Sequence, residues 1–203
     1  MIGIVDYGAG NLRSVIKAFD FLGFKSRLVD RAAALDGAEL LVLPGVGAFG
    51  EAARQLKASG LFDPIRDWLR DDRPFLGICL GLQLLFESSE ESPEEKGFAA
   101  VRGTCRRLAA RKVPQIGWNT VRQAVGGPAA PPLFRGFPDG SYFYFVHSFY
   151  VAPEDPGLIA ATTDYEGAYP SVVARGRTWG VQFHPEKSGE LGLRLLSNWV
   201  RQC

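Results

Sequence analysis

The segment around Cys79 is the part of the chain whose residue types could perform covalent chemistry. Gly77-Ile78-Cys79-Leu80-Gly81 lies between an apolar run and an amphipathic one, which is the form of a nucleophile elbow with cysteine in place of serine. The flanking glycines permit a strained turn, and a helix beginning at Leu80 would direct its amide dipoles at the sulfur and favour the thiolate. Cys105 and Cys203 lack this context, and we expect them to be ordinary buried cysteines. Cys79 is therefore the candidate nucleophile.

A thiol nucleophile needs a base, and the chain holds two histidines. His184 lies in Phe183-His184-Pro185-Glu186, where extended backbone around the proline would put His184 and Glu186 on one side. The carboxylate could then hold one imidazole nitrogen while the other takes the thiol proton. His147 lies in an aromatic, strand-like segment with no acid near it. A surface histidine beside a chance glutamate is the alternative for this fragment by itself, but together with the elbow the sequence favours a triad.

An acyl transfer also needs donors for the negative charge that develops on the substrate oxygen. Leu80, directly after the nucleophile, offers one backbone N–H. Pro44-Gly45-Val46-Gly47 follows another apolar run, and its glycines allow a peptide to turn its N–H toward the site. Val46 and Gly47 are thus candidates for the second donor, and an ordinary turn after a strand is the alternative.

The first half of the chain alternates short apolar runs with longer amphipathic ones, the pattern of an α/β fold with parallel strands. Because the elbow and the glycine-rich turn each follow a predicted strand, we expect them to meet at the carboxyl edge of one sheet. The expected strands of this half are Ile2–Asp6, Lys25–Val29, Glu39–Leu43 and Pro74–Ile78, and the expected helices are Asn11–Leu22, Glu51–Lys57, Pro64–Arg70 and Leu80–Glu87.

From about residue 98 onward the sequence is rich in β-type segments, and we expect this half to extend the sheet. Gly126–Pro132 is too short for a domain linker and is predicted to be a surface loop, so one domain over residues 1–203 is expected. A helix over Leu191–Val200 closes the chain. The expected strands are Ala99–Leu108, Thr120–Val125, Ser141–Val151, Leu158–Thr163, Ser171–Ala174 and Thr178–Phe183.

The glycines after the first predicted strand offer a different interpretation, a nucleotide-binding module. Gly8-Ala9-Gly10, with Asp30 at the end of the second strand, resembles the beginning of a dinucleotide-binding pattern. Arg13 stands where the third glycine is needed for close packing of helix on sheet. We therefore favour a tight strand-to-helix turn and expect no cofactor; a cofactor-binding titration would decide between the two.

The composition narrows the classes of partner and compartment. Twenty-three Lys and Arg against 22 Asp and Glu leave a net charge of +1, so no global field would attract nucleic acid or an anionic membrane. Apolar stretches are interrupted before about 18 residues, so we expect neither a signal peptide nor a membrane span. Three cysteines form no disulfide framework and no pair has metal-ligand spacing, which favours a reducing, cytoplasmic setting and no metal.

These segments together resemble the class I (triad) glutamine amidotransferases. Gly77–Gln83 and Phe183–Glu186 carry the resemblance to the class as a whole. It runs from the first strand to the last helix and implies a flavodoxin-like, mostly parallel central sheet with flanking helices and a β-rich second half. Further segments are similar to one branch, the glutaminase subunits of imidazole glycerol phosphate synthase in histidine biosynthesis: Asp6–Leu12, Pro44–Phe49, Gly117–Asn119, Tyr144–Ser148 and His184–Ser188.

The resemblance implies a role for each member of the triad. Cys79 would attack the side-chain amide of glutamine, His184 would shuttle the proton and Glu186 would orient His184. The products would be glutamate and ammonia, formed through a glutamyl thioester. A non-catalytic subunit that keeps the fold is disfavoured because all three residues are present.

The resemblance also implies where the substrate binds. Gln83 and Glu91 match positions that hold the amino-acid head group of glutamine. The backbone at Ser148 and Phe149 matches the contact to its carboxylate. Glu91 is the weaker match, because several acids crowd the segment 87–95.

A partner subunit is implied as well, because free ammonia is mostly protonated in neutral water and must be delivered through a protected path. By resemblance the partner is a (β/α)8 cyclase subunit, forming a heterodimer, and Asn11, Trp118 and Lys187 are the candidates for its interface. A related amidotransferase subunit that serves another sugar or nucleotide pathway is the alternative. The basic residues Arg106, Arg107, Arg111 and Lys112 are expected to form a solvated face.

Overall fold

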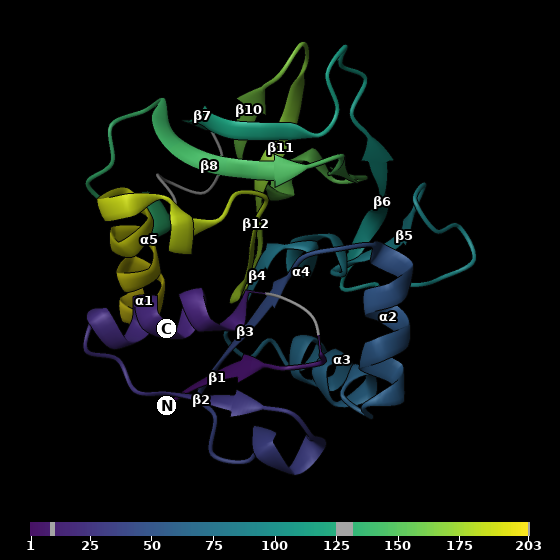
Figure 1. Ribbon diagram of the computed structural model, residues 1–203, viewed down its shortest axis with the longest axis vertical. Coiled ribbons are helices and arrows are strands. Elements are labelled where there is room, and N and C mark those ends of the chain that lie inside the picture. The colour runs from purple at the N-terminus through teal and green to yellow at the C-terminus, as the bar shows by residue number, and fades with distance from the viewer. Residues whose placement is uncertain (9–10, 125–131, 203) are drawn as a thin grey trace.

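A nine-stranded sheet forms the centre of the molecule. The computed structural model describes residues 1–8, 11–124 and 132–202. The strand order is β2-β1-β3-β4-β12-β11-β10-β7-β8 (Figure 1). The neighbours from β2 to β12 run parallel, and those from β12 to β8 run antiparallel. The strands are β1 Ile2–Val5, β2 Ser26–Val29, β3 Leu40–Gly45, β4 Phe75–Cys79, β7 Gln115–Gln123, β8 Ser141–His147, β10 Ile159–Asp164, β11 Ala168–Arg175 and β12 Thr178–Val181.

Helices cover both faces of the parallel half. Successive residues of β3 point to opposite faces, so Leu40 and Val42 join one buried cluster, and Leu41 and Leu43 join the other. α1 (Leu12–Phe21) and α5 (Gly189–Gln202) pack on the first face, and α2 (Phe49–Ala58) and α3 (Phe62–Arg70) on the second. The molecule is therefore a three-layer α/β fold, as the alternation of runs predicted. The short helices are α4 Leu80–Gln83, η1 Ala32–Leu35, η2 Pro132–Phe134, η3 Pro156–Leu158 and η4 Pro185–Lys187.

The predicted elements of the first half are confirmed with one exception, and their bounds shift by at most two residues. The exception is the helix expected over Leu80–Glu87, which ends at Gln83. The chain then forms β5 (Phe86–Ser89), which pairs with β6 (Val101–Arg107) in a second, three-stranded sheet completed by β9 (Phe149–Pro153). Residues 80–85 are all buried, so this run carries no polar face to extend an amphipathic helix into solvent.

The strand expected over Ser141–Val151 is also wrong as a single element. β8 ends at His147 and pairs with β7, whereas β9 begins at Phe149 and pairs with β6 of the small sheet. The chain changes sheets at Ser148, whose carbonyl accepts a hydrogen bond from the Leu108 amide at 2.9 Å. The remaining strands and the last helix of the second half are confirmed with shifted bounds. β7, β8, β10, β11 and β12 extend the central sheet as expected, whereas β6 belongs to the small sheet.

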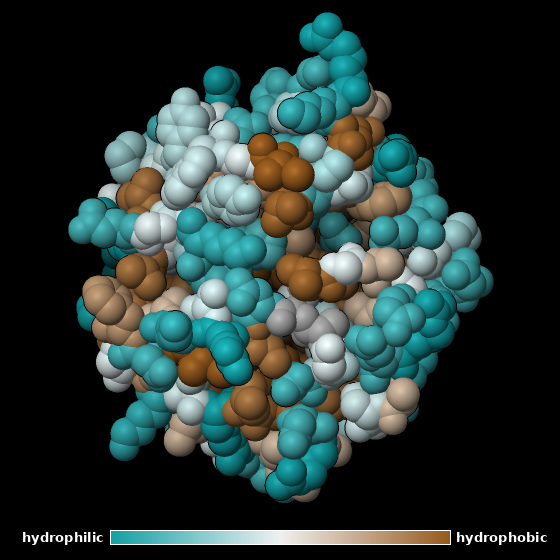
Figure 2. All heavy atoms as spheres, in the orientation of Figure 1, coloured by the Kyte–Doolittle hydropathy of each residue, from teal (hydrophilic) through white to brown (hydrophobic). Residues whose placement is uncertain are grey.

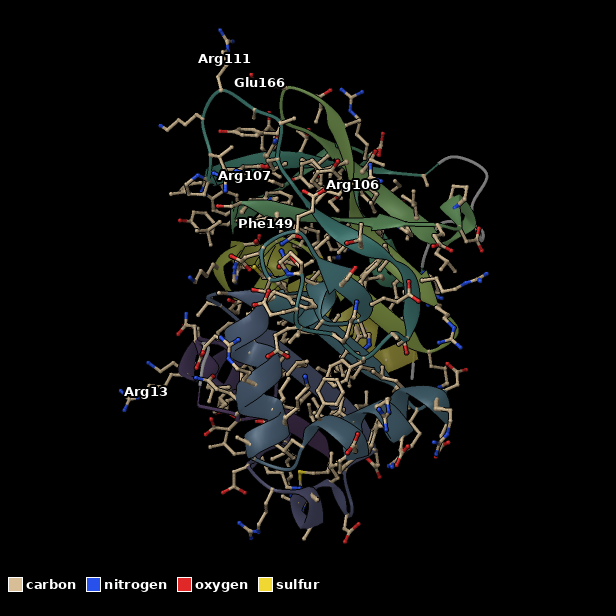
Figure 3. The ribbon with its side chains drawn as sticks, turned by 90° about the vertical axis from the view of Figure 1, so that its right-hand side faces the viewer. Arg13, Arg106, Arg107, Arg111, Phe149 and Glu166 are labelled. Carbon is tan, nitrogen blue, oxygen red and sulfur yellow. The ribbon has the colours of Figure 1, made fainter. Side chains whose placement is uncertain are left out.

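Three predicted features fall wholly or partly outside the described residues. They are Ala9 and Gly10 after the first strand, residues 126–131 of the expected surface loop, and Cys203. Arg13 is exposed and points away from the sheet (Figure 3), so the close helix–sheet contact of a dinucleotide site is not made at this position.

The surface carries its apolar side chains in small groups. On the face shown in Figure 2, hydrophobic residues emerge between polar ones and do not merge into one broad patch. Within the described part of the chain, no helix is both long enough and apolar enough to span a membrane.

Candidate active site

Cys79 lies at the carboxyl end of β4 in a strained backbone conformation. Its φ is +55° and its ψ is −106°, a combination that non-glycine residues avoid. Gly77 and Gly81 allow the chain to pack closely at this turn because neither has a side chain. A Cβ on Gly77 would lie 2.5 Å from the Gly81 carbonyl oxygen, and a Cβ on Gly81 would lie 1.9 Å from the Leu43 oxygen. α4 begins at Leu80, directly after the cysteine. The predicted elbow is confirmed, and its strain is concentrated on the candidate nucleophile.

His184 and Glu186 form the predicted pair beside the elbow. Nδ1 of His184 and Oε1 of Glu186 are 2.8 Å apart, and each side chain is 2% exposed. β12 runs parallel to β4 with Val181 opposite Ile78, so the segment that follows β12 reaches the edge where Cys79 lies. The tertiary structure thus brings together residues more than one hundred positions apart in sequence.

Two opposing influences act on the pKa of His184. Burial lowers it by disfavouring the charged ring, but the Cys79 sulfur and the Glu186 carboxylate prevail and raise the pKa of His184 to about 10. Nε2 makes no hydrogen bond of normal geometry to any described residue, and Cys79 and Glu186 both act on the ring. The arrangement favours the charged form of the His184 ring beside Cys79, with Glu186 holding the far nitrogen.

His147 is buried nearby but both of its nitrogens are engaged. Nδ1 lies 2.9 Å from the Phe149 carbonyl oxygen and must donate, and Nε2 lies 3.1 Å from the Tyr169 hydroxyl oxygen. The Tyr169 hydroxyl donates to Oε1 of Gln115 at 2.8 Å. Burial lowers the pKa of His147 to about 4. A neutral ring with two committed nitrogens does not serve as the base for Cys79.

Gln83 is held one turn after the nucleophile. Its Nε2 donates to the Phe149 carbonyl at 3.0 Å and lies 3.4 Å from Oε1 of Gln182. Gln182 Nε2 lies 3.7 Å from the Cys79 sulfur. Ser148 and Phe149, where the chain passes from the large sheet to the small one, therefore lie beside Gln83. Three of the four predicted substrate contacts, Gln83, Ser148 and Phe149, are thus close together.

The glycine-rich turn after β3 lies next to the elbow. Gly45 is opposite Cys79 in the register of β3 and β4, and Val46 and Gly47 follow it as exposed residues. Gly47 has a φ of +101°, a conformation that glycine adopts without strain. The structure thus places the predicted donors Val46, Gly47 and Leu80 around Cys79.

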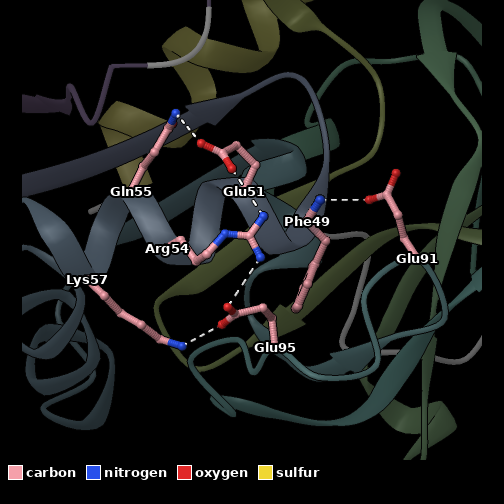
Figure 4. A network of polar contacts seen from close by, with 7 residues as sticks. All are labelled: Phe49, Glu51, Arg54, Gln55, Lys57, Glu91 and Glu95. Atoms are coloured by element: carbon pink, nitrogen blue, oxygen red, sulfur yellow. Dashed lines mark hydrogen bonds and ion pairs between the residues drawn. The ribbon is translucent and has the colours of Figure 1, made fainter.

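Glu91 comes from the acidic loop between β5 and β6 and is bonded to the start of α2. Its Oε2 accepts from the Phe49 backbone N–H at 2.7 Å (Figure 4). Phe49 is the first residue of α2, so Glu91 satisfies one of the helix's unpaired N-terminal donors. Because α2 starts directly after the glycine-rich turn, Glu91 also anchors the end of that turn.

Ion pairs fasten the same loop further along α2. Glu95 accepts from Lys57 at 2.7 Å and from Arg54 at 3.4 Å, and Arg54 also pairs with Glu51 (Figure 4). A Cβ on Gly50 would lie 2.6 Å from the Ser92 hydroxyl, so loop and helix are in close contact between these pairs. The acidic loop and α2 therefore form one packed unit.

Two of the three predicted interface residues contact Tyr144 of β8. Trp118 is 56% exposed and packs edge-on to Tyr144 at 6.1 Å between ring centroids, and the Lys187 ammonium lies 5.9 Å from the same ring. Asn11 precedes α1, which packs against the η4 segment that contains Lys187. Asn11 occupies the N-cap position of α1 without a side-chain capping bond.

The basic residues around β6 are exposed and spread out (Figure 3). Arg111 is paired with Glu166 at 3.3 Å, and Arg107 lies over the Phe149 ring at 5.9 Å. This arrangement is the solvated face that the sequence favoured.

Three supporting residues carry no clear signal in the sequence and were not predicted. Gln182 directly follows β12, and its contact with Cys79 depends on sheet register. Ser188 Oγ donates to the His184 carbonyl at 2.6 Å and accepts from the Tyr144 amide at 3.0 Å. Tyr169 orients His147 from β11. No local pattern distinguishes Ser188 or Tyr169 from other strand and loop residues.

Comparisons with known proteins show the family to which the chain belongs. Residues 3–203 match the family described as glutamine amidotransferase class-I. The chain is 47% identical over 206 residues to imidazole glycerol phosphate synthase subunit HisH of Desulfitobacterium hafniense, covering 100% of this chain and 96% of the relative. It is 46% identical to the subunit of the same name from Chlorobaculum tepidum, covering 98% and 99%.

Solved structures share the fold at lower identity. A crystal structure of a glutamine amidotransferase matches with a TM-score of 0.77 and 18% identity, covering 98% of this chain and 97% of that one. A chain in the PurLQS structure from Thermotoga maritima matches with a TM-score of 0.72 and 20% identity, covering 99% and 97%.

Proposed function

The chain belongs to the class I glutamine amidotransferases, and we propose that it is the glutaminase subunit of an imidazole glycerol phosphate synthase in histidine biosynthesis. The catalytic assignment rests on one observation: the side chains of Cys79, His184 and Glu186 are buried together at one edge of the sheet. Nδ1 of His184 lies 2.8 Å from Oε1 of Glu186. The assignment to this synthase rests on relatives of that name that match essentially the whole chain.

The reaction follows from the positions of the three residues. The Cys79 sulfur adds to the side-chain amide carbon of glutamine, and the carbonyl oxygen takes the negative charge near the Leu80 N–H and the 46–47 turn. The imidazolium of His184 gives its proton to the departing nitrogen, which leaves as ammonia, and a glutamyl thioester remains. Water then attacks the thioester with His184 as base, releasing glutamate and the thiolate. Glu186 keeps the ring in position throughout.

The amino-acid head group of the substrate would lie beside the acidic loop and beside Ser148 and Phe149, where the chain changes sheets. Glu91, which binds the Phe49 amide, and Gln83, which binds the Phe149 carbonyl, would line this region together with the backbone at Ser148 and Phe149. A carboxylate suits the ammonium of glutamine, and backbone amides suit its carboxylate. A reducing compartment such as the cytoplasm keeps the Cys79 thiol available.

The relatives are named as subunits of a synthase, so a partner subunit is implied. We propose that the partner is a (β/α)8 cyclase and that the pair is a heterodimer, with Trp118, Lys187 and Asn11 at the interface. The exposed Trp118 ring and the Lys187 ammonium both contact Tyr144, and the Val146 carbonyl of the same strand lies 3.8 Å from the Cys79 sulfur. A partner bound there would cover the active-site edge and receive the ammonia.

The proposal is tested by the rate of glutamate formation at saturating glutamine in three mixtures. These are the chain alone, the chain with the cyclase, and the chain with the cyclase and its ribotide substrate. We expect slow hydrolysis alone and the fastest hydrolysis in the third mixture, because the 44–47 turn can rotate a peptide N–H into the site when the partner complex closes. Gain of one oxyanion donor is worth about 100- to 1,000-fold in rate.

Equal rates in all three mixtures would contradict this coupling and would favour a stand-alone glutaminase. Stimulation by another pathway's synthase, and none by the cyclase, would instead favour an amidotransferase subunit that serves a different sugar or nucleotide pathway.

The role of Glu91 can be separated into two parts with two substitutions. In Glu91→Gln the carboxamide oxygen still accepts from Phe49, but the charge that meets the substrate ammonium is lost. We expect the KM for glutamine to rise about 10- to 100-fold while kcat stays within about threefold. In Glu91→Ala the anchor of α2 is lost too, so kcat should fall in addition.

Glu95→Gln is the matched control. It weakens the pairs with Arg54 and Lys57 on the same loop but leaves the bond from Phe49 intact. Its KM for glutamine should equal that of the unsubstituted chain, measured in the same complex. An unchanged KM in Glu91→Gln would mean that another group holds the ammonium.

A further inference from the structure

Tyr7 is a buried tyrosine whose hydroxyl the fold does not use. The side chain follows β1, is 5% exposed, and packs in the buried cluster on the α2 and α3 face of the sheet. Its hydroxyl has no hydrogen-bond partner among the described residues. A buried hydroxyl without a partner is unfavourable, and phenylalanine would fill the same space without that cost. The hydroxyl therefore needs an explanation other than packing.

The hydroxyl lies directly behind the glycine-rich turn. A Cβ built on Gly45 would lie 2.7 Å from the Tyr7 oxygen, 2.9 Å from the Leu80 Cβ and 3.3 Å from the Gly81 nitrogen. β1 pairs with β3, so the residues that follow both strands reach the same edge of the sheet as Cys79. Tyr7 thus occupies the space between the end of β3 and the start of α4.

The geometry of a peptide unit connects this position to the oxyanion. The N–H and the C=O of one peptide point in opposite directions. A peptide of the 45–47 turn that presents its N–H to the substrate oxygen must send its carbonyl, that of Gly45 or Val46, toward the interior. A carbonyl turned inward needs a donor, because a buried carbonyl without one is costly.

We propose that the Tyr7 hydroxyl is that donor: it positions the 45–47 turn by hydrogen-bonding the inward carbonyl when the turn presents its N–H to the tetrahedral intermediate. This inference rests on the proposed glutaminase function and adds to it a positioning residue that does not touch the substrate. The Tyr7 hydroxyl then gains its hydrogen-bond partner when the turn presents its N–H to the substrate.

The protonation state of Tyr7 fits a donor. Burial and the nearby charge of Cys79 both raise the pKa of Tyr7, so its hydroxyl keeps its proton across the working pH range. The close approach of Gly45 also explains why glycine stands there, since a side chain would collide with the hydroxyl and with Leu80.

Tyr7→Phe tests the proposal in the complex of the chain with the cyclase and its ribotide substrate. The substitution removes one oxygen and keeps the ring. We expect kcat for glutamine hydrolysis to fall about 10- to 100-fold, the effect of leaving a buried carbonyl without its donor, with the KM for glutamine within about twofold. Alkylation of Cys79 by iodoacetamide should keep its rate, because displacement of iodide forms no oxyanion.

Stability separates a positioning role from a structural one. Since the hydroxyl has no partner among the described residues, Tyr7→Phe should melt at or above the Tm of the unsubstituted chain. Tyr165→Phe is the matched control: it loses a hydrogen bond to the Lys112 carbonyl at 3.0 Å, away from the site, and should keep kcat.

If kcat of Tyr7→Phe, in the complex with the cyclase and its ribotide substrate, stays within about twofold of the kcat of the unsubstituted chain, the proposed role of Tyr7 is wrong. A fall in kcat that comes with a clear loss of Tm also overturns this role, because the hydroxyl would then support the resting fold. If the unsubstituted complex itself does not hydrolyse glutamine, the proposed function fails, which is distinguishable from the failure of this inference.

Discussion

Cys79→Ala should abolish glutamine hydrolysis, with a loss of at least about 10,000-fold in kcat. In the proposed reaction the Cys79 thiolate forms the covalent intermediate, and among the described cysteines Cys79 is the one that acts on His184. Alanine fits the elbow without new contacts, and what is lost is the interaction with His184 and the weak sulfur contacts at 3.7 and 3.8 Å. The variant should therefore keep its Tm within a few degrees and still bind the partner subunit. Initial rates of glutamate formation and a thermal melt measure both expectations.

Cys105→Ala is the matched control for this substitution. Cys105 is also buried, and burial first, then the charge of Glu91, raises the pKa of its thiol, so it stays protonated and unreactive. Its loss should leave kcat within about tenfold of the unsubstituted chain. Glutamate formation by purified Cys79→Ala at more than about a hundredth of the normal rate would refute the assignment of the nucleophile.

His184→Ala should lower kcat to within about tenfold of the value for Cys79→Ala, because the members of a triad act as a unit. His147→Asn should retain most of the activity: an amide NH₂ near the Nδ1 position can still donate to the Phe149 carbonyl, and the ring it replaces is neutral. The comparison uses kcat at saturating glutamine in the full complex. The reverse order of damage would identify His147 as the base.

The pH dependence of kcat/KM follows from the raised pKa of His184. As the pH rises through about 10, the ring loses the proton that it must give to the departing nitrogen, so the rate falls on the alkaline side. Glu186→Gln removes one of the charges that raise this pKa. The alkaline fall should therefore begin about 1–3 pH units lower, in addition to a lower maximum. An alkaline limb that stays in place would mean that Glu186 does not act on His184.

Much of the site could be predicted from the sequence because its chemistry is encoded at short range. The elbow needs glycines two residues from Cys79, and a histidine can reach a glutamate two residues away in extended backbone. The repeated strand and helix pattern of the first half places the ends of parallel strands at one edge, and this pattern by itself predicts that Cys79 and the 44–47 turn meet there. These features depend on a few neighbouring residues and on the geometry of one α/β unit.

Other features depend on segments that meet only in the folded chain. The helix after Cys79 ends at Gln83 because the next residues pair with β6, and the strand expected over Ser141–Val151 breaks because its halves join different sheets. In both cases a local pattern is overruled by a partner strand distant in sequence.

The two histidines show the same division. The sequence singles out His184 through its adjacent carboxylate, but only the folded chain shows that His147 is buried near the same site with both nitrogens engaged. Likewise, the anchoring of α2 by Glu91 and the position of Tyr7 behind Gly45 join residues about 40 positions apart. Residue type and close spacing determine what chemistry is available to this chain. Which groups are free to perform it is decided by tertiary packing, because burial and distant hydrogen-bond partners set charge, orientation and access.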